Sequence, residues 1–149
     1  MFIALVAPAF AQKYKTPADT GKLNLEYVKV QNKIAELTAK LSTAQGNLPD
    51  YQTKALNAEN TAKTANNTSD MSASKANSGN LSDVKDAKNS ANDAYDKAKD
   101  AQSANKEVGK QNEKIIDLSN DLMKQRQRLQ ELDRMRAAIE AQLPANMNH

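Results

Sequence analysis

Apolar residues recur with coiled-coil spacing along the first half of the chain. They alternate four and three positions apart at Leu23, Tyr27, Val30, Ile34, Leu37, Leu41 and Ala44. This spacing is typical of a seam, the line of side chains that one helix buries against a partner helix. The same phase continues to Ala76 through Gly46 and Pro49, two residues that favour a kink. The pattern therefore predicts a first helical arm over 17–77, with a kink near 46–49.

The start and end of this arm carry their own signals. Thr16, Pro17 and Asp19 have the order expected of a helix cap, a first helical residue and a capping acid. At the other end, Gly79 can terminate the arm and Asn80 can cap the next helix. We therefore expect a hairpin tip at 78–80.

A second series with the same spacing follows the tip. It predicts a second helical arm over 81–143, which Pro144 stops. The series comprises Ala87, Ala94, Ala101, Val108, Ile115, Leu122, Leu129, Arg136 and Leu143, with a companion series at Ser90, Lys97, Ala104, Gln111, Leu118, Gln125, Leu132 and Ile139.

The two series mirror each other about the tip. When residues whose numbers sum to 159 are paired, Leu37 faces Leu122, and nearer the tip Ala58 faces Ala101. Large residues thus face large ones and alanines face alanines, so the partner of the first arm lies in the same chain. The predicted fold class is all-α, a long antiparallel helical hairpin of the coiled-coil type.

Six apolar residues fall outside the seams, and three of them, Ile116, Met123 and Ala137, share a heptad position. A helix pair leaves such residues exposed, whereas a four-helix bundle buries them. They predict an interaction stripe through which two hairpins form a four-helix base. Scattered apolar surface residues are the simpler alternative. The stripe consists of Leu25, Val28, Ala35, Ile116, Met123 and Ala137.

The first eleven residues predict export. Met1–Ala11 is uncharged and apolar, and Ala9-Phe10-Ala11 matches the small-x-small pattern of a signal peptidase site. We expect a signal-peptide remnant at 1–11 cleaved after Ala11, and a periplasmic or extracellular protein. The alternative is an apolar helical turn without a targeting role. Residues 12–16 are expected to form an N-terminal extension and 144–149 a tail.

The composition argues against catalysis. The chain lacks cysteine and tryptophan, and its only histidine, His149, is the last residue. No glycine-rich loop follows a strand pattern, and the serines have no histidine to activate them. We therefore expect no enzyme activity, no cofactor, no metal and no small-molecule substrate.

The charges are interleaved, and 21 basic against 18 acidic residues leave a formal net charge of +3. Most of them indicate a solvated helix surface. One basic stretch is a candidate contact for anionic lipid or an acidic partner. Nucleic acid is disfavoured, because no aromatic or glycine residue accompanies the stretch. Its cations are Lys124, Arg126, Arg128, Arg134 and Arg136.

These features predict a non-catalytic exported hairpin that acts as a structural scaffold or protein-interaction module. Its expected partner is another protein or a second copy of the chain. A holdase-like chaperone or adaptor for exported proteins is one alternative, and a membrane-surface tether is another.

Overall fold

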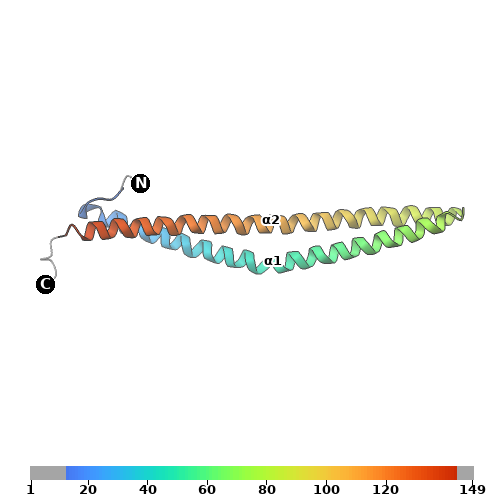
Figure 1. Ribbon diagram of the computed structural model, residues 1–149, viewed down its shortest axis with the longest axis horizontal. Coiled ribbons are helices and arrows are strands. Elements are labelled where there is room, and N and C mark those ends of the chain that lie inside the picture. The colour runs from blue at the N-terminus through green and yellow to red at the C-terminus, as the bar shows by residue number, and fades with distance from the viewer. Residues whose placement is uncertain (1–12, 144–149) are drawn as a thin grey trace, which may run out of the picture. The chain divides into compact units, whose positions relative to one another are not determined.

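The computed structural model describes residues 13–143, so the predicted signal peptide and tail lie outside the described residues (Figure 1). A short 3-10 helix, η1 (Pro17–Asp19), precedes two long α-helices, α1 (Thr20–Ala76) and α2 (Leu81–Glu140). The two long helices pack against each other, and the described part of the chain contains no strand. The predicted all-α helical hairpin is confirmed.

The first arm begins as its capping residues indicate. The Asp19 carboxylate accepts hydrogen bonds from the backbone N–H groups of Lys15 and Thr16 and from the Thr16 hydroxyl. The Lys15 N–H contributes most to lowering the pKa of Asp19. Pro17 occupies the first helical turn, where a missing N–H costs nothing. The cap opens η1, and the α-helix proper begins only at Thr20.

The tip turn contains a backbone conformation that suits glycine. Gly79 has φ +83°, in the left-handed region that side chains with a Cβ rarely adopt. Its N–H donates to the Ala76 carbonyl, which satisfies one acceptor at the end of α1. Asn80 Oδ1 then accepts from the Ser82 N–H at 3.0 Å and caps α2. Both assignments agree with the sequence prediction.

The hairpin divides into two compact units, each built from an α1 segment and an α2 segment. The base unit comprises the described residues 13–39 and 119–143, and the tip unit comprises residues 40–118. The base buries large side chains such as Leu23, Leu37, Leu122 and Leu132. The tip buries mainly alanines, namely Ala44, Ala55, Ala62, Ala65, Ala94 and Ala101. Because a fully buried leucine contributes roughly 1.5–3 kcal/mol, the base holds more of the apolar stabilisation.

The second seam departs from the prediction at its end. Arg136 and Leu143, both expected in the seam, are exposed, and Met135 is buried instead at 5% exposure. Burying the Arg136 guanidinium would cost its hydration, and it pairs with Glu140 at 3.2 Å. Met135, whose side chain is flexible and apolar, fills the core position. Helix α2 also ends at Glu140 rather than at residue 143.

Helix α1 continues through Pro49, which lies inside it. Nothing in the helix boundaries tests the kink expected near 46–49, so it stays a prediction. Five residues before Pro49, the Ala44 carbonyl accepts a hydrogen bond from the buried Gln111 side chain of α2 at 2.6 Å. This bond satisfies the one polar side chain among the buried residues of the tip unit.

Candidate interaction surface

The base unit has a core with a third component besides the two helices. Residues 13–16, which we call the N-terminal strap, place Tyr14 in the core at 6% exposure. Its ring belongs to one apolar cluster with Leu23, Val30, Leu132, Met135 and Ile139, flanked by the half-buried Tyr27, Ile34 and Leu129. Residues 13–16 of the expected N-terminal extension are therefore part of the folded base.

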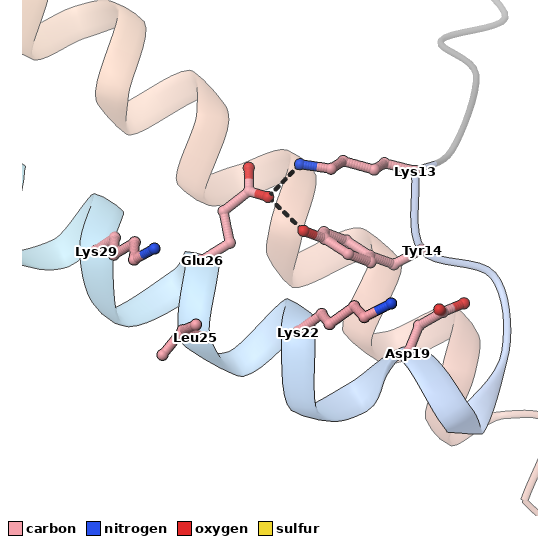
Figure 2. Close-up of a pocket in the computed structure, with 7 residues that line it drawn as sticks. All are labelled: Lys13, Tyr14, Asp19, Lys22, Leu25, Glu26 and Lys29. Atoms are coloured by element: carbon pink, nitrogen blue, oxygen red, sulfur yellow. Dashed lines mark hydrogen bonds and ion pairs between the residues drawn. The ribbon is translucent and has the colours of Figure 1, made fainter.

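A polar cluster centred on Glu26 ties the strap to both helices. The Tyr14 hydroxyl and Lys13 Nζ donate to Glu26 Oε2, the latter at 3.0 Å (Figure 2). From α2, Arg128 Nε donates to Glu26 Oε1 at 3.0 Å, and Arg128 Nη1 reaches Glu131 at 2.8 Å. One carboxylate thus joins the strap, α1 and α2, and its bonds to Arg128 span 102 residues.

The Glu26 carboxylate is strongly biased toward its ionised form. The hydrogen bond from the Tyr14 hydroxyl, followed by that from Arg128, lowers the pKa of Glu26 from 4.5 to about 2. Each of these donors stabilises the charged acceptor more than the neutral acid. Reciprocally, the hydrogen bond to Glu26 raises the pKa of Arg128. At neutral pH the ionised Glu26 carboxylate therefore holds the strap, α1 and α2 together through charged hydrogen bonds.

All six residues of the predicted interaction stripe are exposed. Leu25 is 61% exposed, Val28 51%, Met123 54% and Ile116 58%, and the two alanines are also on the surface. Ile116 belongs to the tip unit, whereas the other five belong to the base. The base therefore combines a firm core with apolar side chains that the single chain leaves uncovered.

The basic stretch of α2 is less available than its sequence indicates. Lys124 pairs with Asp121 at 3.2 Å, Arg136 pairs with Glu140, and Arg128 is engaged by Glu26 and Glu131. Only Arg126 and Arg134, of the five candidate contacts, are in no described ion pair. Ion pairs within the base therefore occupy three of the five candidate contacts.

Sequence reasoning did not find the roles of Tyr14 and Met135. Tyr14 is a lone aromatic residue two positions before a helix cap, and no periodicity marks it. Its chemistry offers one usable signal, because a tyrosine needs a partner for its hydroxyl when its ring is buried. Glu26, in the second turn of α1, supplies that partner.

Two other kinds of feature are absent from the described part of the chain. Residues 13–143 contain no group of three or more side chains suited to holding a metal ion. Neither α1 nor α2 includes, in its described residues, a stretch with the length and hydropathy of a membrane span.

Comparison with known proteins identifies no relative: no family model, curated protein or solved structure matches the chain. Function must therefore be inferred from the residues themselves.

Proposed function

We propose that the chain is a non-catalytic, exported coiled-coil hairpin that acts as a structural scaffold or protein-interaction module. In this proposal, it associates with a second copy through its base. The observation that carries it is the exposure of Val28 and Met123 on a unit whose interior is already closed by large apolar side chains. Because the core of the base is already filled, these two side chains are free to pack against a second chain.

Four stripe residues share one flank of the base. At about 100° per residue along a helix, Val28 lies far around α1 from Glu26, and Met123 lies far around α2 from Arg128. Since Glu26 and Arg128 meet on one flank, Val28 and Met123 fall toward the other. We call Val28, Ala35, Met123 and Ala137 the association face. Its small and apolar residues suit close packing of a second hairpin into a four-helix base.

Export is proposed on the sequence of residues 1–11, with cleavage after Ala11. Expression of the full chain in a bacterium with a secretory pathway, followed by intact-mass measurement, tests it. A mature chain beginning at Gln12 supports export, and a full-length chain confined to the cytoplasm overturns it.

The association face is tested by measuring the mass of the full chain in solution over a range of concentrations. We expect a dimer for the wild type, and a shift toward monomer for Val28→Gln combined with Met123→Gln. The matched control is Leu56→Gln combined with Met71→Gln, which changes two equally exposed apolar residues of the tip unit. A monomeric wild type, or a control that dissociates the dimer as strongly, overturns the proposed face.

A holdase-like chaperone or adaptor is separated from a scaffold by a second assay. The full chain is added in excess to an unfolding client protein, and light scattering follows aggregation of the client. A scaffold leaves aggregation unchanged, whereas suppression by the full chain favours the chaperone and contradicts the scaffold.

A further inference from the structure

The charge of the protein is unevenly divided between its two units. The base contains ten lysines and arginines against seven acidic residues, whereas the tip contains eleven of each. The whole formal net charge of +3 therefore belongs to the base. A local excess of positive charge attracts anionic partners.

Part of this positive charge surrounds an open hollow on the base. The hollow has a volume of about 600 Å³ and is lined by Lys13, Tyr14, Asp19, Lys22, Leu25, Glu26 and Lys29 (Figure 2). All of these residues come from the strap, η1 and the first turns of α1. They lie on or near the flank that carries the Glu26 cluster, and Leu25, three residues before Val28, adjoins the association face.

The two acids in the hollow are already engaged by the protein. Glu26 accepts from Lys13, Tyr14 and Arg128, and Asp19 accepts from the residues of the helix cap. Lys22 acts on Asp19 only through space, and Lys29 is in no described ion pair. The ammonium groups of Lys22 and Lys29 are thus left to solvent or to a ligand.

An apolar side chain lies between these two lysines. Leu25 follows Lys22 by three residues and precedes Lys29 by four, so the three share one face of α1 (Figure 2). Leu25 is 61% exposed. Lysines flanking an exposed leucine are typical of helices that lie on a membrane surface, where the leucine enters the interface and the amines meet headgroups.

We propose that Lys22, Leu25 and Lys29, which we call the lysine face, dock the base of the hairpin onto an anionic lipid surface. Lysine ammonium groups are point charges on flexible stems, and they suit a layer of mobile headgroups. Recognition of a defined acidic peptide would instead favour arginines with fixed bidentate geometry. No arginine lines the hollow, and Arg128, which reaches Glu26 from α2, pairs with Glu26 and Glu131.

This inference goes beyond the proposed scaffold function and uses different residues. Association depends on Val28 and Met123, whereas lipid docking depends on the lysine face. Failure of the dimer in solution therefore leaves lipid docking intact, and failure of lipid docking leaves the dimer intact.

The experiment is co-sedimentation of the full chain with vesicles of phosphatidylcholine, with and without phosphatidylglycerol. We expect binding only when the anionic lipid is present, and weaker binding as salt is raised. Lys22→Gln combined with Lys29→Gln should reduce the partition coefficient about 20- to 30-fold, because each lysine near an anionic surface contributes roughly fivefold. The control, Lys63→Gln combined with Lys88→Gln, removes the same charge from the tip and should have a much smaller effect.

The apolar contribution is tested with a second matched pair. Leu25→Gln should weaken binding about 5- to 10-fold, as expected when a leucine no longer enters the interface. Leu56→Gln changes a residue of the same helix with nearly the same exposure, 58%, and should leave binding unchanged. Circular dichroism of each variant confirms that helix content is retained.

Three results would overturn the proposal. The first is equal binding to vesicles with and without phosphatidylglycerol. The second is an equal loss of binding in the lysine-face variants and in their tip controls. The third is binding to soluble polyglutamate without binding to anionic vesicles, which would assign the face to an acidic polypeptide instead.

Discussion

Replacing Glu26 with glutamine removes the negative charge at the centre of the base cluster while keeping the shape of the side chain. The fall in the pKa of Glu26 from 4.5 to about 2 corresponds to at most about 3.5 kcal/mol in favour of the ionised form. Because 22% of the side chain remains exposed, solvent screens part of this stabilisation. We expect Glu26→Gln to lower the free energy of unfolding by about 1–2 kcal/mol at pH 7.

The pH dependence has a definite sign. A carboxylate whose pKa is depressed in the folded state stabilises the fold above its unfolded pKa, and this stabilisation is lost as pH falls through the folded pKa. The difference between wild type and Glu26→Gln should therefore be full above about pH 5 and shrink between pH 4.5 and about 2. Urea unfolding followed by circular dichroism at several pH values measures it.

The control is Glu113→Gln, which changes an exposed glutamate of the tip unit that is in no described ion pair. It should alter stability by less than about 0.5 kcal/mol. An NMR titration of the Glu26 side-chain carboxyl gives its pKa directly. A Glu26→Gln variant as stable as wild type at pH 7, or a stability difference that does not change with pH, would refute the role assigned to the cluster.

Three further changes test other features of the fold. Tyr14→Phe keeps the buried ring but removes the donor to Glu26, so the pKa of Glu26 should rise and urea unfolding should show a loss of about 1–2 kcal/mol. Pro49→Ala should stabilise α1 by up to about 3 kcal/mol, because proline inside a helix removes a hydrogen bond; an unchanged unfolding midpoint would contradict this. Gly79→Ala should lower the melting temperature by an amount equivalent to about 1 kcal/mol, since its φ of +83° strains any residue with a Cβ.

The sequence predicted the two arms and the tip because their signals are local. The 4-3 spacing places one side of each helix inside, and residues from Leu23 to Ala76 in the predicted first seam are all buried or half-buried. The tip was equally readable, since a glycine and an asparagine in that order mark a helix end and a helix start. Short-range rules of this kind need no knowledge of distant contacts.

The features that the sequence did not predict depend on contacts between distant segments. Tyr14 is buried because the strap folds against α1 and α2. The same cluster buries Met135 in place of Arg136, which the spacing had placed in the seam. The Glu26–Arg128 pair joins residues separated by 102 positions. The sequence also grouped Arg128 with neighbouring basic residues, without indicating that its guanidinium pairs with Glu26 and Glu131.

The division into two units has a consequence for the order in which the protein can fold. The tip unit is one continuous segment, residues 40–118, whereas the base is made from both ends of the chain. Contacts that are local in sequence close quickly, and those that span long loops close late. During synthesis or passage through a narrow pore, the tip can therefore assemble first. The core around Leu132 and Ile139 can close only when nearly the whole chain has emerged, so a chain truncated before these residues leaves the apolar residues of the strap and early α1 uncovered for quality-control proteases.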